Sequence, residues 1–207
     1  ESADNFCQNF PYTFCGTKDN KGKKNGFGIQ KWKDDSKYIG NFNNNIAIGW
    51  GILYHSSGDI YKGEFVNDKT NGYGEYLHKN GDHYQGYWVN DTQYGVGVEN
   101  WNDLSKYEGE YKFGVKDGIG KYIWPDGSIY RGEWKKNDVE GYGIFNFKDG
   151  RIYIGEWKNN KMDGYGECTW NDSRIYCGFY KNDKKEGFGI FYWPKNNFFL
   201  GFWKQGQ

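Results

Sequence analysis

The sequence is poor in the aliphatic residues that usually fill a protein core, with only four leucines and one methionine. Such a composition would suit a disordered chain if one sign of charge prevailed, but 27 basic residues balance 27 acidic ones. Aromatic residues are abundant instead: 15 Phe, 19 Tyr and 10 Trp. Because each ring buries a large area, the composition predicts an ordered chain with a thin, aromatic core.

Basic runs and long apolar runs are also missing. Lysines lie beside Asp or Asn, as in "KKND" and "KNDKKE", whereas proteins that bind nucleic acids or anionic membranes normally carry a basic patch. We therefore expect no nucleic-acid partner, and the neutral charge disfavours membrane lipids. No stretch reaches the length and apolarity of a transmembrane helix.

The start, "ESADNFCQNFPYTFCG", has neither the basic nor the apolar region of a signal peptide, so we expect a protein that is not secreted. It lacks an initiator Met, and we expect a processed product or a piece of a longer chain. The cysteines, Cys7, Cys15, Cys168 and Cys177, form no CxxC pair and have no histidine at zinc-binding spacing. The sequence thus predicts reduced thiols and no metal site.

A pattern of 23 residues repeats along the chain. Position 1 of the pattern is Tyr in seven copies: Tyr38, Tyr61, Tyr84, Tyr107, Tyr130, Tyr153 and Tyr176. Positions 3, 12 and 14 are Gly in all seven, and position 5 is aromatic. The predicted organisation is a non-repeat cap (1–13), a degenerate repeat (14–37), seven repeats (38–198) and the first strand of a truncated eighth repeat (199–207).

Each repeat reads as a hairpin. Aromatic residues alternate with Gly at positions 1, 3 and 5, which is the period of a strand. The second run ends in "WPDG" or "FKDG" before the next Tyr, and Asp-Gly is a strong hairpin signal because both turn residues can take positive φ. The chain is therefore predicted to be a meander of about sixteen antiparallel strands.

A two-residue Asp-Gly turn also predicts the register. Around Asp126–Gly127 it sets Ile123 opposite Tyr130, so that positions 1, 3 and 5 share a face with positions 13, 15 and 17. The aromatic of "GYG" then lies on the face of the repeated Tyr. The same register places Cys168 opposite Cys177, although we expect thiols there. Gly at position 3 is expected to leave room for rings that lie across the backbone.

These residues, "YxGEW" followed by "GYG" and "DG" every 23 positions, resemble the MORN repeat, well from Tyr38 to about Trp203 and weakly over 14–37. The resemblance implies an all-β fold: an elongated, open, single-layer antiparallel β-meander of repeated hairpins with no closed core. Two strands per repeat at about 4.8 Å spacing would give a rod about 70–80 Å long. Where MORN repeats commonly have Gly after the Trp, this sequence has Asn or Asp, which also tolerate turns.

No catalytic motif is present, and we predict a non-enzymatic protein without a cofactor. Position 4 is Glu in four copies, Glu64, Glu110, Glu133 and Glu156, but their even spacing follows from the repeat and nothing encloses them. His55 and His78 occupy position 18, where other copies have Trp, and we expect them to stack as aromatic substitutes rather than bind metal.

Three functions stay open. The first is a protein-interaction scaffold that binds a helix or extended segment of a partner. The second is a phospholipid-binding module, and the third is the targeting array of a larger enzyme such as a lipid kinase or methyltransferase, both of which the resemblance implies. Neutral charge favours the first, because membrane binding draws on basic residues. The resemblance further implies a cytoplasmic, cytoskeleton-associated setting, in a ciliary radial-spoke-like or membrane-skeleton assembly.

Two sets of residues are predicted to make contacts outside the chain. Partner binding is expected in the middle of the array, along the face of positions 1 and 5: Tyr84, Trp88, Tyr107, Tyr111, Tyr130, Trp134, Tyr153 and Trp157. The last strand would present an aromatic edge through Phe199, Phe202 and Trp203, and exposed edges tend to recruit another chain. We therefore expect end-to-end dimerisation into a homo-oligomer, or coverage of this edge by a partner or by a continuation of the chain. Position 4 glutamates are expected to be exposed and dispensable for the fold.

Overall fold

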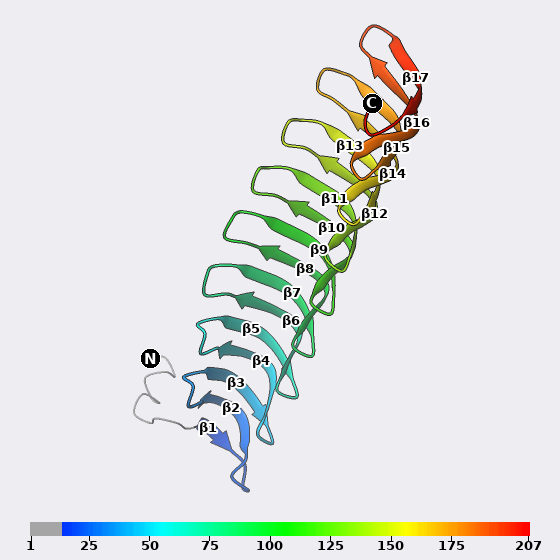
Figure 1. Cartoon of the computed structure of the whole chain (residues 1–207). Helices are drawn as coiled ribbons and strands as arrows, with labels where there is room; N and C mark the ends of the chain where they lie inside the picture. Colours follow the sequence, from blue (N-terminus) through cyan, green and yellow to red (C-terminus); the bar gives the residue numbers. More distant parts are fainter. Residues whose placement is uncertain (1–13) are drawn as a thin grey trace. The chain divides into compact units, whose positions relative to one another are not determined.

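A computed structural model describes residues 14–207, which form 17 strands and no helix (Figure 1). The predicted cap at 1–13 lies outside these residues. The chain divides into two compact units, up to Asn102 and from Asp103 to Gln207, which we call unit 1 and unit 2. No helix of the described residues is long and apolar enough to cross a membrane.

Unit 1 contains eight strands of alternating length, joined in chain order by short turns. They are β1 (Phe14–Lys18), β2 (Lys24–Lys31), β3 (Lys37–Asn43), β4 (Ile46–Tyr54), β5 (Ile60–Val66), β6 (Lys69–Leu77), β7 (His83–Val89) and β8 (Thr92–Asn100). Each strand pairs antiparallel with the next one along the chain.

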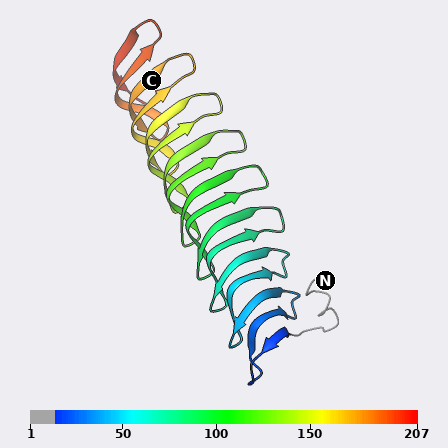
Figure 2. The ribbon, with the colours of Figure 1, turned by 180° about the vertical axis from the view of Figure 1, so that it is seen from behind.

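Unit 2 contains nine strands arranged in the same way. They are β9 (Lys106–Lys112), β10 (Val115–Ile123), β11 (Ile129–Lys135), β12 (Asp138–Asn146), β13 (Ile152–Lys158), β14 (Lys161–Thr169), β15 (Ile175–Lys181), β16 (Lys184–Trp193) and β17 (Asn197–Trp203). Consecutive strands again pair antiparallel. Figure 2 shows the hairpins of each unit side by side, so the predicted open β-meander is confirmed.

The predicted register at the Asp-Gly turns is wrong by one residue. Tyr122, not Ile123, pairs with Tyr130. As a result, position 1 faces position 16 and position 3 faces position 14, while position 13, the aromatic of "GYG", turns to the opposite face. The same shift pairs Cys168 with Tyr176 rather than with Cys177.

The cause of the shift is a three-residue loop. The N–H of Gly127 donates to the Trp124 carbonyl, and the Trp124 N–H donates to the Ser128 carbonyl, each at 2.9 Å. Within this loop only Gly127 has a positive φ, of 89°. Pro125 at the first loop position has a fixed negative φ that suits a type I turn, and the same two hydrogen bonds close the loop at Phe147–Arg151, where Lys148 takes that position.

The repeated glycines have two different roles. Those at positions 3 and 14 face each other and lie under the ring of the position 1 Tyr: a Cβ on Gly132 would meet the Tyr130 hydroxyl and come within 2.6 Å of the Cα of Gly143. The expected space for a ring across the backbone is thus confirmed. Gly at position 12 serves the backbone instead, as at Gly141, where φ is 67° and the second strand of the repeat bulges.

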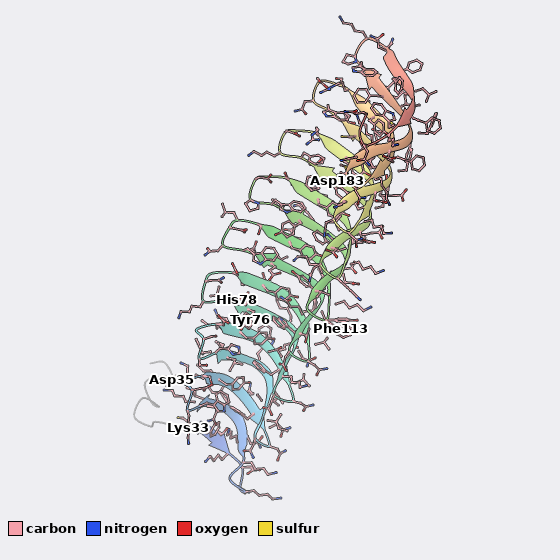
Figure 3. The ribbon with its side chains drawn as sticks, in the orientation of Figure 1. Lys33, Asp35, Tyr76, His78, Phe113 and Asp183 are labelled. Atoms are coloured by element: carbon pink, nitrogen blue, oxygen red, sulfur yellow. The ribbon has the colours of Figure 1, made fainter. Side chains whose placement is uncertain are left out.

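The turn that follows each position 5 aromatic has two consecutive residues at positive φ, as in Asn67 (52°) and Asp68 (64°). This is the geometry of a type I′ turn, which Asn and Asp tolerate. Figure 3 labels Phe113 and Asp183, which lie in two turns of this kind.

The turns whose second residue is Asn or Asp are also tied to the preceding repeat by a pair of hydrogen bonds. The Asp68 N–H donates to the Ala47 carbonyl at 3.1 Å, and the Ala47 N–H donates to the Asp68 carboxylate at 2.7 Å. Val139 and Asn160 form the same pair in unit 2, at 3.0 Å and 2.7 Å. Asn or Asp at this position therefore stabilises the junction between repeats.

The cysteines differ from one another. The expectation of reduced thiols is wrong for Cys15, which is disulfide-bonded, whereas Cys168 and Cys177 are free. Disulfide formation depends on the distance between two Cα atoms in the fold, which a search for closely spaced cysteines in the sequence does not reveal.

Candidate functional site

The eight aromatic residues predicted to bind a partner lie on one face of the strands, which we call the inner face. Tyr130 packs edge-to-face against both Trp134 and Trp157, with ring centroids 5.5 Å away in each case. Its hydroxyl donates to the Glu133 carbonyl at 3.1 Å. The Trp134 indole N–H donates to the Gly120 carbonyl at 3.3 Å. Tyr and Trp of successive repeats thus interlock within each unit.

All eight rings are buried, none exposing more than 8% of its surface. Burial also raises the pKa of Tyr130 above its ordinary value, because the phenolate would be poorly solvated. These residues form the core of the meander and offer a partner little area. Their part in partner binding stays a prediction, and the exposed aromatic surface lies elsewhere.

The opposite face, which we call the outer face, carries a series of large apolar residues that remain exposed. Position 13 recurs among them: Trp50 is 59% exposed and Tyr142 is 55% exposed. Position 4 adds others, among them Tyr87 and Phe179. The outer row, as we name it, comprises Trp50 and Tyr87 in unit 1 and Ile119, Tyr142, Tyr165, Phe179, Phe188 and Phe202 in unit 2.

Neighbouring members of the outer row contact each other across strand pairs. Tyr165 pairs with Phe179 at a centroid distance of 5.6 Å, and Phe188 pairs with Phe202 at 5.5 Å. The sequence prediction missed this row because the two-residue turn assigned position 13 to the inner face. The middle residue of each "GxG", combined with a three-residue turn, would have identified it.

The position 4 glutamates on the outer face have a structural role. The Glu133 carboxylate accepts a hydrogen bond from the Tyr142 N–H at 3.0 Å, and Glu156 accepts one from the Tyr165 N–H at 3.2 Å. Glu133 is exposed, as expected, but its carboxylate also lies over Gly141, the position 12 residue at positive φ. Substituting it therefore disturbs the bulge as well as the surface, so the expectation that it is dispensable is too simple.

On the inner face of unit 1 the aromatic rings leave an open groove of about 990 Å³. Ala47, at repeat position 10, forms part of its lining. The remaining lining comes from Lys24, Trp32, Lys33, Asp34, Ser36, Tyr38, Phe42, Asn45, Leu53, His55, Ser56, Phe65 and Asp68. Figure 3 labels Lys33, in the turn between β2 and β3.

Position 10 decides how much of the inner face is filled. Its occupants along the chain are Lys24, Ala47, Thr70, Gln93, Lys116, Val139, Met162 and Lys185. The lysines place their ammonium groups over aromatic rings: the Nζ of Lys24 lies 5.2 Å from the ring centroid of Phe42, and that of Lys116 lies 5.3 Å from Tyr107. Such contacts are cation–π interactions.

Lys185 has the most complete aromatic surroundings of this kind. Its Nζ lies 5.4 Å from the ring centroid of Trp170, 5.0 Å from Tyr176, 4.4 Å from Phe191 and 4.5 Å from Trp203. Burial among these rings lowers the pKa of Lys185, and burial likewise lowers that of Lys24. We call the four rings around Lys185 the Lys185 box.

The histidines behave as aromatic substitutes, in line with the sequence. His78 stacks on Tyr76 at a centroid distance of 4.7 Å, and both are labelled in Figure 3. The Nδ1 of His78 also lies 3.7 Å from the Asp59 carboxylate. Within residues 14–207 no group of three or more His, Cys, Asp or Glu side chains is placed to hold a metal ion.

Two of the three residues predicted to form a self-association edge are exposed: Phe199 by 46% and Phe202 by 80%. Trp203 is partly buried and packs edge-to-face on Tyr176 at 5.3 Å. Phe202 points to the outer face and pairs with Phe188, so it belongs to the outer row. Self-association through this strand stays a prediction.

The family model of the MORN repeat matches most of the chain. The matched segments are residues 20–37, 61–83, 84–106, 107–129, 130–150, 153–173 and 176–198. A comparison with curated protein sequences finds no match.

Solved structures similar to this chain include domains from two organisms. The TCP10 domain of CPAP from Danio rerio is 11% identical, with 93% of this chain and 91% of that chain covered and a TM-score of 0.50. The TCP domain of SAS-4 (dCPAP) from Drosophila melanogaster, in complex with a proline-rich motif of Ana2 (dSTIL), is 13% identical, with 84% and 88% covered and a TM-score of 0.46. At these identities the likeness concerns the fold alone.

Proposed function

The chain belongs to the MORN-repeat family, and from this premise we propose that it is a protein-interaction scaffold that acts by binding rather than by catalysis. The single observation that carries the proposal is the outer row. Large apolar side chains that are about half exposed and lie in contact with one another mark interaction surfaces in soluble proteins.

Within the outer row, unit 2 offers the larger apolar surface. Tyr165, Phe179, Phe188 and Phe202 form two contacting pairs on successive repeats, and Leu200 beside them is 50% exposed. Aromatic residues contribute contact area at little entropic cost, which suits the anchoring of apolar side chains from a partner. The proposed partner is a helix or extended segment of another protein.

The proposed setting is a cytoplasmic, cytoskeleton-associated assembly, as the resemblance implies. The cytosol keeps most thiols reduced, so the disulfide at Cys15 is the feature on which this setting can be tested. Subcellular fractionation of the native protein, with the redox state of Cys15 determined by thiol labelling, tests this part of the proposal.

Affinity purification from native extract tests the scaffold itself. The double variant Tyr165→Ser with Phe179→Ser removes the centre of the outer row, and both residues are about half exposed, so the fold is expected to survive. We expect specific partners to fall at least about tenfold in quantitative mass spectrometry, since central aromatic anchors dominate interface energies. The control Leu104→Ser alters an 83% exposed side chain in a turn and should retain them.

Equal recovery of the same partners by the double variant would exclude the outer row as the binding surface. Salt-sensitive sedimentation of the wild-type protein with phosphoinositide vesicles would instead favour the lipid-binding alternative, because electrostatic attachment to anionic lipid weakens as salt increases.

A further inference from the structure

The groove around Ala47 is formed by the same repeat positions as the Lys185 box, but an alanine stands in place of the lysine. The residues that correspond to Trp170, Tyr176, Phe191 and Trp203 are Trp32, Tyr38, Leu53 and Phe65, each 138 residues earlier, which is six periods of 23. All four line the groove. We call these four the Ala47 box, with Ala47 standing 138 residues before Lys185.

We propose that the Ala47 box is a binding site for the side chain of a lysine from a partner protein, which fills the place that Lys185 fills in its own box. The molecule itself supplies the precedent: at three positions of the inner face an ammonium group lies over aromatic rings. The site lies on the opposite face from the outer row and stands independently of it.

Three rings of the Ala47 box retain the cation-binding surface. Trp32, Tyr38 and Phe65 are aromatic like their counterparts, and only Leu53 replaces a ring. The Ala47 side chain is a single methyl group, so nothing from this position occupies the space that the lysine stem takes elsewhere. The groove volume of about 990 Å³ is within the range of ligand pockets and accommodates a whole side chain with part of its backbone.

Two carboxylates lie in the lining of the Ala47 box. Asp68 lines the groove and uses one carboxylate oxygen to accept the Ala47 N–H at 2.7 Å, while the corresponding residue at the Lys185 box is Gly206. Asp34 adds a second carboxylate to the lining. These acids favour an ammonium group over an apolar side chain.

Two lysines also line the groove, and their positions limit where the ligand lies. Lys24 directs its Nζ to the rings of Phe14 and Phe42, at 5.5 Å and 5.2 Å, so it occupies the box of the preceding repeat. Lys33 lies in the exposed turn at one end of the groove. The incoming ammonium is therefore expected over the contacting rings of Tyr38 and Phe65, on the side of Asp68.

The test is a titration followed by NMR of the ¹⁵N-labelled full chain. The probe is Nα-acetyl-lysine methylamide, and the matched control is Nα-acetyl-norleucine methylamide, which has an apolar side chain of similar length without the ammonium. We expect a saturable shift of the Trp32 indole N–H at millimolar lysine probe, since single cation–π sites are weak. The norleucine probe is expected to bind at least about fivefold more weakly.

Two variants locate the site. Ala47→Lys places a tethered ammonium in the box and should abolish the Trp32 shift. Lys185→Ala opens the second box and should create a new saturable site, reported by the indoles of Trp170 and Trp203, that the wild-type protein lacks.

An unchanged Trp32 titration in Ala47→Lys, equal binding of the norleucine probe, or no saturation in the wild-type protein each overturns the proposal. If Ala47→Lys does not fold, the comparison of the two probes and the Lys185→Ala variant still test whether the box binds a lysine side chain. Because the probes need no protein partner, failure here leaves the outer row proposal standing, and loss of partners in the outer row variant leaves this site untouched.

Discussion

The two faces of the strands treat aromatic residues in opposite ways. On the inner face, position 1 is Tyr in seven copies, and each of these rings is at least 98% buried between two neighbouring aromatic residues and a pair of glycines. On the outer face, position 13 is Trp, Tyr, Phe or an aliphatic residue, and most of these side chains, such as Trp50, Tyr142 and Phe188, stay about half exposed. Close packing fixes the identity of a residue, whereas an exposed position can vary from repeat to repeat.

This difference indicates which positions of such an array can recognise a partner. The inner rings recur because removing any of them leaves a space that its rigid neighbours do not fill. The outer row and the variable position 10 differ between copies, so they can distinguish one partner from another. Each of the following substitutions compares a fixed position with a variable one.

The largest effect is expected from truncating an inner ring. Tyr130→Ala should lower the free energy of unfolding by about 3–5 kcal/mol, because it leaves a cavity between Trp134 and Trp157. Tyr142→Ala on the outer face should cost less than about 1 kcal/mol. Urea denaturation followed by circular dichroism measures both, and equal losses would contradict the division between the faces.

A smaller effect is expected at position 12, where the backbone demands Gly. Gly49 and Gly141 both have a φ of 67°, so Ala at either should destabilise the chain by about 1–2 kcal/mol. Only at Gly141 would the added Cβ also meet a carboxyl group, that of Glu133, whereas nothing lies within 4 Å at Gly49.

Thermal unfolding of the two Gly→Ala variants separates these contributions. Gly141→Ala should melt at a lower temperature than Gly49→Ala, because Glu133 must move as well. If Gly49→Ala is as stable as the wild-type protein, the positive φ does not explain the repeated Gly at position 12.

The outer carboxylates should contribute less again. Glu133→Ala removes the acceptor for the Tyr142 N–H, and we expect a loss of about 1 kcal/mol. Glu133→Gln keeps an acceptor oxygen and should lose less than half of that. Hydrogen exchange at the Tyr142 amide provides the local measurement: faster exchange in the Ala variant alone supports the role, and no change in either variant contradicts it.

The smallest effect on stability is expected from ionisation of the buried tyrosine hydroxyls as the pH rises. Burial raises the pKa of Tyr38 and of Tyr176 to about 12, above the value of about 10 for an unfolded tyrosine. Because the folded state holds these protons more tightly, their contribution to stability is complete below pH of about 10 and is lost as the pH rises toward 12.

The melting temperature should therefore begin to fall above pH of about 10, and Tyr176→Phe should reduce the steepness of that fall because Phe has no proton to lose. Calorimetry between pH 8 and 11, in steps of half a unit, measures both curves. Identical slopes for the variant and the wild-type protein would show that this phenol does not link pH to folding.

The sequence was enough to predict the hairpins and their order, since Tyr, Gly and aromatic residues at alternate positions have the period of a strand. It did not predict the register, because that depends on whether the Asp-Gly turns have two or three residues, and the three-residue form occurs with and without proline, at Trp124–Ser128 and at Phe147–Arg151. A shift of one residue moved the exposed aromatics to the wrong face. The burial of positions 1 and 5 has another source, the packing of rings from successive repeats, which the alternating pattern does not reveal.

The Ala47 groove was harder to foresee. It exists because a small residue stands among large rings that come from the turn before β3, from β3 and from β5. Its recognition needs the pairing register, which shows that Ala47 and Lys185 have equivalent surroundings. In the sequence alone, Ala47 is simply one of the different residues that occupy position 10 of the pattern.

The hydrogen bonds that join the Asn and Asp turns to the preceding repeat have a consequence for how such a chain can change in evolution. The pair between Ala47 and Asp68 links residues only 21 positions apart, and the same holds for Val139 and Asn160. A duplicated or deleted segment of one whole period reproduces such links at its new boundaries, whereas gain or loss of a single residue between two linked residues breaks their link. Genes of this kind can lengthen by whole repeats without any new interface having to arise.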